Sequence, residues 1–206
     1  MKAMFFQRLF AYVIDIVLVS FIVGILMSLL FPSVKTENAN DELMTLAERL
    51  ISNQITTEVY INRAVDLTHK TATKRIGLDI ITFTIYVLYF VVYQFYNGGQ
   101  TLGKRIMRIR IIKKDGNKIK TTSLSTNDLA KRSLIINGLL MSIITLTSFF
   151  LGSKTFYFYV FVMAEMLQIL IVIISAFMIL YREDGCGLHD VFAGTKVVID
   201  KEVNIR

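Results

Sequence analysis

The chain has 206 residues, of which 54% are hydrophobic and 19% are charged, and its mean hydropathy is +0.56. Soluble domains usually contain about 45–50% apolar and about 25% charged residues, so this composition excludes an ordinary soluble domain and favours a membrane protein embedded in a lipid bilayer. The net charge of +7 does not indicate nucleic-acid binding, because no nucleic-acid-binding motif accompanies it and the positive charges gather in one loop, as they do in membrane proteins.

Four apolar segments reach about the 20 residues that a membrane helix needs. They cover about residues 9–31, 76–96, 133–151 and 156–181. The first is too long for a signal-peptide core, and no A-x-A-like site follows it, so we expect it to stay in the membrane. Gly24, Gly77 and Gly138 do not predict broken helices. We therefore expect an all-α membrane protein, a single domain over residues 1–206 built as a bundle of four transmembrane helices.

The first apolar segment carries a carboxylate, Asp15, and begins beside an arginine, Arg8. A charge inside the bilayer costs about 2.5–3.5 kcal/mol on insertion scales, so an intramembrane carboxylate indicates a functional site. Arg8, Ala11 and Asp15 are spaced i, i+3, i+7, which places them on one face of a helix. This face is expected to turn toward other helices or water.

The loop charges predict the orientation. Residues 97–132 carry ten lysines and arginines and only two aspartates, which assigns this loop to the cytoplasm. The tail, residues 182–206, and both termini then lie in the cytoplasm as well. Residues 32–75 become extracytoplasmic, although Lys74 and Arg75 at their end run against the rule. We expect a multi-pass protein of the cell membrane.

The extracytoplasmic segment 32–75 has an amphipathic pattern. Apolar residues recur at helical spacing between Leu43 and Ile51 behind a start signal at Asn40-Asp41, and a second short helix is predicted from Thr57 through Val65. These helices either cap the outer surface of the bundle or act as a lid or partner-docking element.

The cytoplasmic loop also predicts β structure. Met107, Ile109 and Ile111 alternate with arginines, and Asp115-Gly116 is a hairpin signal that would lead into a return strand at 119–122. Residues 195–199 form another β-branched run. We expect a small cytoplasmic sheet that joins the loop to the tail.

Three ordered motifs carry a resemblance to a known family. They are Arg8 with Asp15, the run Gly99-Gln100-Thr101-Leu102-Gly103-Lys104-Arg105 followed by residues 109–112 and 115–116, and Leu188-His189-Asp190 followed by residues 193–198. Together they resemble the RDD family of bacterial integral membrane proteins, which is named for one arginine and two aspartates. Asp190 is the candidate for the second aspartate, and residues 32–75 resemble an insertion. Members of this family are often described as transporters; some resemble cation/proton antiporters and others resemble accessory subunits.

Intramembrane carboxylates give the functional hypothesis. We predict monovalent cation/proton antiport, in which Asp15 and Glu165 bind a cation or a proton in competition. Asn137 and Gln168 would add neutral oxygen ligands. Asp79, one turn into the second apolar segment, is a secondary candidate. Four helices are few for a secondary transporter, so a transporting form is expected to be a homo-oligomer.

Two alternatives stay open. Arg8 either holds an inner gate by pairing with Asp15 or Asp190, or it pairs with Asp190 while Asp15 bonds a helix end, so that the three form a structural lock. The chain is then either a transporter or a non-catalytic accessory subunit that docks a partner membrane protein through residues 32–75 and the helices.

Enzymatic chemistry is not expected. The run from Gly99 to Lys104 lacks the spacing of a phosphate-binding loop and predicts a tight turn. Cys186, His189 and Asp190 supply at most three ligands, whereas a zinc site needs four or an open catalytic position. We expect no catalytic residue, no metal and no cofactor.

Overall fold

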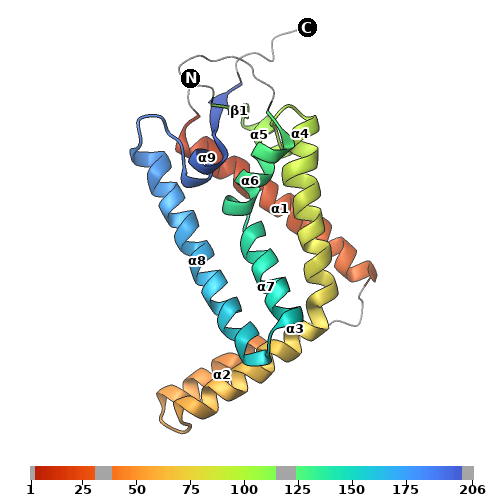
Figure 1. The fold of residues 1–206 in the computed structure, drawn as a ribbon, viewed down its shortest axis with the longest axis vertical. Coiled ribbons are helices and arrows are strands. Elements are labelled where there is room, and N and C mark those ends of the chain that lie inside the picture. Colours follow the sequence, from red (N-terminus) through yellow and green to blue (C-terminus); the bar gives the residue numbers. More distant parts are fainter. Residues whose placement is uncertain (1–2, 31–38, 115–123, 201–206) are drawn as a thin grey trace.

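The computed structural model of the chain describes residues 3–30, 39–114 and 124–200, which form a bundle of long helices with a small sheet at one end (Figure 1). Three helices are long and apolar enough to cross a membrane. They are α1 (Phe5–Leu30), the continuous helix formed by α3 (Thr57–Val87), η1 (Leu88–Tyr93) and α4 (Gln94–Tyr96), and α8 (Lys154–Tyr181). The fold is thus a mostly helical membrane bundle, as predicted.

The third predicted span is broken. Helix α6 (Thr126–Ile136) and helix α7 (Leu139–Leu151) meet at an angle of 72°, and they make one further span only if the bent pair is counted as one. Gly138 lies between them with φ +69°, a left-handed conformation that cannot continue the helix. The prediction that Gly138 does not break a helix, and that residues 133–151 form an unbroken one, is therefore wrong.

The helix that contains the second span begins earlier than predicted. The segment 32–75 does contain a helix, α2 (Ala39–Ile51), but the expected second short helix is the first part of α3, which runs without interruption from Thr57 into the span. Thr56 begins it by accepting a hydrogen bond from the backbone N–H of Val59 at 3.4 Å. Figure 1 shows α2 packed beside the start of α3, at the end of the bundle opposite the sheet.

The sheet joins the loop to the tail, as expected. Strand β1 (Ile109–Lys113) pairs antiparallel with β2 (Thr195–Ile199), with Ile111 opposite Val197. The short helices α5 (Leu102–Ile106) and α9 (Leu188–Ala193) flank these strands. The expected hairpin at 115–116 and its return strand lie outside the described residues. We call this part of the molecule, formed by α5, β1, α6, α9 and β2, the basic end.

The membrane-facing surface is apolar. Helix α1 buries a single stripe, made of Arg8, Ala11, Asp15 and Val19, which confirms the predicted common face of the first three. The other faces of α1 and most of α8 expose large hydrophobic side chains. Exposed apolar surface on this scale indicates contact with lipid or with another protein rather than with water.

Candidate functional site

Asp15 lies fully buried in a ring of donors. Its carboxylate accepts hydrogen bonds from the Tyr89 hydroxyl at 2.6 Å, from the backbone N–H of Gly103 at 2.8 Å and from the Thr101 hydroxyl. The Lys104 ammonium lies 3.8 Å from Oδ2. Both carboxylate oxygens are therefore satisfied, and the charge has a buried counter-ion.

The glycine-containing run after the second span builds most of this ring. Thr101 is the N-cap of α5. Its hydroxyl and the backbone N–H of Gly103 in the first turn both donate to Asp15. Gly103 is required by close packing, because a Cβ there would lie 2.1 Å from the carbonyl oxygen of Ala11. The predicted tight turn is present at residues 97–99, and Thr101 and Gly103 after it also bind the carboxylate of Asp15.

Tyr89 reaches Asp15 from η1, where the long helix widens to π-helical geometry. A π-helical segment inserts an extra residue in a turn and is common at functional sites. The Tyr89 oxygen also accepts a hydrogen bond from the backbone N–H of Leu102 at 3.1 Å. The hydroxyl thus ties the second span, α1 and α5 together.

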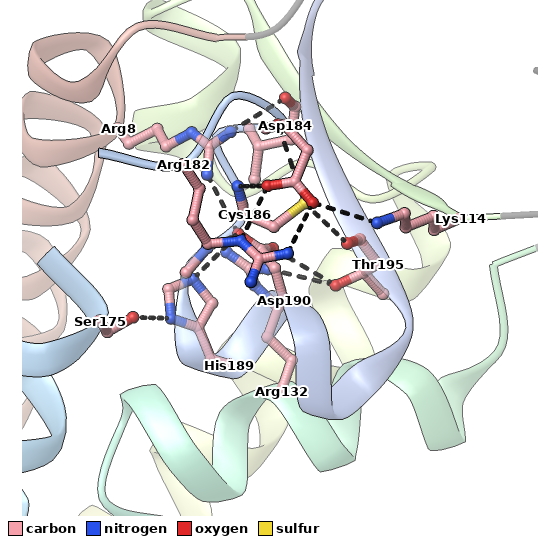
Figure 2. Close-up of polar contacts among 12 residues, drawn as sticks. Arg8, Lys114, Arg132, Ser175, Arg182, Asp184, Cys186, His189, Asp190 and Thr195 are labelled. Carbon is pink, nitrogen blue, oxygen red and sulfur yellow. Dashed lines mark hydrogen bonds and ion pairs between the residues drawn. The ribbon is translucent and has the colours of Figure 1, made fainter. Parts of the chain in front are cut away.

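Asp190 forms the second buried centre, between two arginines (Figure 2). Arg8 donates to Oδ2 at 3.0 Å, and Arg132 of α6 donates to Oδ1. Arg8 also donates to the carbonyl oxygen of Val197 at 3.2 Å. Of the predicted alternatives for Arg8, the structure shows the pair with Asp190 and none with Asp15.

The charges around Asp190 shift its pKa and that of its neighbour. Burial raises the pKa of Asp190, but Arg132 and Arg8 outweigh this and lower it to about 2. Burial, together with Arg132, lowers the pKa of His189 to about 3. His189 is therefore neutral at pH 7, with Nδ1 2.6 Å from the Ser175 hydroxyl and Nε2 3.5 Å from Asp190. An Nε2–H tautomer suits both neighbours, because Ser175 can then donate to Nδ1.

The remaining predicted site residues lie elsewhere, around a cavity of about 370 Å³ between α3, α7 and α8. Asp79, Asn137, Glu165 and Gln168 all line it. Asp15 does not line it, so the structure separates the two carboxylates that were predicted to share an ion. Asp79 and Glu165 are both exposed residues. Neither carboxylate makes a hydrogen bond or an ion pair with another described residue, although Arg75 interacts electrostatically with Asp79 at longer range.

Gln168 connects this cavity to the broken helix. Its Nε2 donates to the carbonyl oxygens of Ile135 and Ile136, both at 3.3 Å, which the break at Gly138 leaves without helical partners. Its Oε1 is buried and has no hydrogen-bond partner within the described part of the chain. Carboxylate and amide oxygens are the ligands that hard cations prefer. The cavity therefore offers such ligands at a discontinuity in a membrane helix.

Several residues of the two buried centres were not predicted. Tyr89, Thr101 and Lys104 surround Asp15, and Arg132 completes the Asp190 centre. The sequence signal for Arg132 was present, since an arginine that continues a helical pattern toward an apolar segment is not an ordinary loop charge. Tyr89 had no such signal, because its direction depends on the π-helical turn.

Comparison with known proteins gives one match. The model of the RDD family matches residues 2–194, a range that includes Arg8, Asp15, Arg132 and Asp190 and every lining residue of the cavity between α3, α7 and α8. Neither the curated proteins nor the solved structures contain a significant match to the chain.

Proposed function

The chain belongs to the RDD family, a family of membrane proteins, and from this premise we propose that it exchanges a monovalent cation for a proton through the cavity between α3, α7 and α8. Asp79 and Glu165 are the carboxylates that alternately hold the cation and the proton. Asn137 and Gln168 supply neutral oxygens. The observation that carries this proposal is the gathering of these four side chains around one cavity.

The contrast between the two kinds of carboxylate supports this assignment. Asp15 and Asp190 are saturated by donors and cations, so a cation could bind there only by displacing them. Asp79 and Glu165 are exposed and accept no hydrogen bond and form no ion pair among the described residues, and Arg75 interacts with Asp79 only at longer range. An intramembrane carboxylate without a partner is costly unless it is protonated or binds an ion, and exchange between these two states is the chemistry of an antiporter.

The broken helix supplies a second line of support. Asn137 and Gly138, at the bend between α6 and α7, both line the cavity. Secondary transporters commonly bind ions where a membrane helix is interrupted, because unwound backbone and helix ends offer oxygen ligands there. The Oε1 atom of Gln168 has no partner in the described chain and lies beside Gly138, where an added Cβ would be 3.5 Å from it.

In this proposal Arg8, Asp15 and Asp190 lock the basic end and bind no ion. Their contacts join α1 to α5, α6, α9 and β2, and the loop charges favour a cytoplasmic location for this end. The backbone N–H of Ala3 donates to Val197 at 3.2 Å, so the N-terminal segment and the tail lie on the same side of the membrane.

Purified protein in proteoliposomes with an imposed pH gradient tests the proposal. Added sodium, lithium or potassium should dissipate the gradient in the wild type, and Glu165→Gln and Asp79→Asn should each abolish the effect. Asp66→Asn is the matched control, because Asp66 is an exposed carboxylate that pairs with Lys154 outside the cavity. A gradient that all three cations leave intact in wild type, or equal exchange by Glu165→Gln, would sink the proposal.

The accessory-subunit alternative has one supporting feature. Met44 and Ile51 on α2 are exposed apolar side chains at the extracytoplasmic end of the proposed topology. A partner that copurifies in stoichiometric amount, and is lost when residues 40–66 are deleted, would favour this alternative. If purified wild-type protein exchanges cations in the absence of any partner protein, transport does not require a partner.

A further inference from the structure

A second cavity, of about 140 Å³, lies at the basic end between α1, α6, α8 and α9. Its charged lining consists of three cationic side chains, Arg8, Lys104 and Arg132, and its other polar lining residues are uncharged, namely Tyr12, Gln94, Ser133, Asn137, Ser175 and His189. The rest of the lining is largely apolar. It is separate from the cation/proton cavity, because Asn137 is the sole described residue that lines both.

The charges around this cavity do not balance. Arg8, Lys104 and Arg132 supply three positive charges, whereas their buried counter-ions, Asp15 and Asp190, supply two negative ones. His189 is neutral at pH 7, because burial and Arg132 lower its pKa. A buried positive charge without a counter-ion is unfavourable, so the site as a whole favours an anion.

Arg8, which lines the cavity, has one hydrogen-bond donor without a partner among the described residues. The Arg8 side chain is 8% exposed, and its Nη atoms are used by Asp190 and Val197. Its Nε is buried and has no hydrogen-bond partner within residues 3–30, 39–114 and 124–200. Arginine binds phosphate oxygens through its fork of N–H donors, and here one donor of the fork remains unused.

The opening of the cavity is apolar. Leu9 of α1 and Val172 of α8 line the cavity and are also exposed on the outer surface of these helices. That surface faces lipid in the membrane. An anion that enters this way therefore carries an apolar body, which is the description of a lipid.

We propose that this cavity binds the phosphate of an anionic phospholipid, such as phosphatidylglycerol, whose acyl chains lie along the apolar surface between α1 and α8. The volume corresponds to about five water molecules at about 30 Å³ each, which suits a phosphate group and excludes a whole lipid. Basic pockets between membrane helices on the cytoplasmic side are known as head-group sites. The bound lipid supplies the negative charge that the buried cations lack.

Thermal unfolding of the full chain in detergent tests the proposal. Phosphatidylglycerol should raise the melting temperature with saturation, and phosphatidylcholine, whose head group has no net charge, should raise it less at equal concentration. Inorganic phosphate is titrated in a third arm. If it stabilises the protein as well as phosphatidylglycerol does, the site is one for free phosphate and the lipid assignment is wrong.

Variants locate the effect. Lys104→Gln removes one cavity cation and should weaken phosphatidylglycerol binding about fivefold, at about 1 kcal/mol per cation. Lys131→Gln is the matched control, because Lys131 is exposed at the same end and does not line the cavity. Equal weakening by both variants, or none by Lys104→Gln, would show that the cavity is not the site.

A steric variant keeps the test valid if Lys104→Gln does not fold. Ala176 lines the cavity, so Ala176→Leu fills part of it without changing the charge and should remove the phosphatidylglycerol-dependent shift. Ala47→Leu on α2, at the opposite end, should leave the shift unchanged. A full shift in Ala176→Leu would overturn the proposal.

Discussion

Replacing Asp190 by asparagine should be among the most destabilising single substitutions in the chain. Asp190 is fully buried and lies between the guanidinium groups of Arg8 and Arg132. Asparagine keeps the size of the side chain but removes the charge, so two buried cations face each other without a counter-ion. Breaking a buried pair in this way costs about 3–5 kcal/mol, or at least a hundredfold in the unfolding equilibrium constant.

Asp184→Asn provides the matched control for this measurement. Asp184 also pairs with two cations, Arg182 and Lys114, and Figure 2 shows it close to the Asp190 centre. Its side chain is 26% exposed, and exposed ion pairs contribute about 0–1 kcal/mol. Unfolding by sodium dodecyl sulfate in mixed micelles, followed by circular dichroism, gives both free energies. Costs for the two variants that agree within 1 kcal/mol would refute the assignment of Asp190 as the buried counter-ion.

Two further predictions concern the same end of the molecule. Stability should fall as the pH drops, by up to about 1.4 kcal/mol per pH unit, between about pH 6.5 and 3 for His189 and between about pH 4 and 2 for Asp190, because both pKa values are lower in the folded protein than in the unfolded chain. Melting temperatures measured from pH 7 to pH 2 test this prediction. In His189→Gln the loss of stability between about pH 6.5 and 3 should be smaller. Stability that rises as the pH falls toward 4 would contradict the prediction. Gly103→Ala should lower the free energy of unfolding by about 1–3 kcal/mol, because the new Cβ would clash with the Ala11 carbonyl oxygen. The control is Gly24→Ala, where a new Cβ would have no atom within 4 Å, and it should be neutral or stabilising in chemical denaturation. Equal destabilisation by the two variants would argue against close packing at Gly103.

The parts of the fold that were predictable depend on short-range patterns. The apolar lengths predicted the membrane helices, the i, i+3, i+7 spacing predicted the buried face of α1, and the alternation around Ile109 predicted β1. Even the pairing of β1 with β2 followed from two β-branched runs at one end. Each of these signals is a property of a few neighbouring residues or of two similar runs.

The break at Gly138 is a feature that short-range sequence patterns do not predict. A single glycine in an apolar run is compatible with a continuous helix, and the sequence does not show that Gln168, 30 residues later, satisfies the carbonyls of Ile135 and Ile136. These hydrogen bonds from Gln168 stabilise the bend in the membrane, because they satisfy carbonyl oxygens that the bend leaves without helical partners. A local pattern cannot contain this information.

The candidate site was predicted in composition but not in arrangement. From their depths in the membrane, Asp15 and Glu165 were predicted to lie on one ion path. In the structure Asp15 contacts α5, whereas Glu165 lines the cavity together with Asp79. Depth says nothing about the direction in which a side chain leaves its helix. The partners of Asp15 come from a run after the second span, and only the folded chain brings them to α1.

Proton release on cation binding tests the central claim most directly. Protein purified in detergent at low buffer strength is mixed with sodium, lithium or potassium, and a pH indicator reports protons set free. A cation that displaces a proton from the cavity carboxylates should acidify the medium with wild-type protein and with Asp66→Asn, and should not do so with Glu165→Gln. Wild-type protein that releases no proton with any of the three cations, or Glu165→Gln that releases as much as the wild type, would contradict the account.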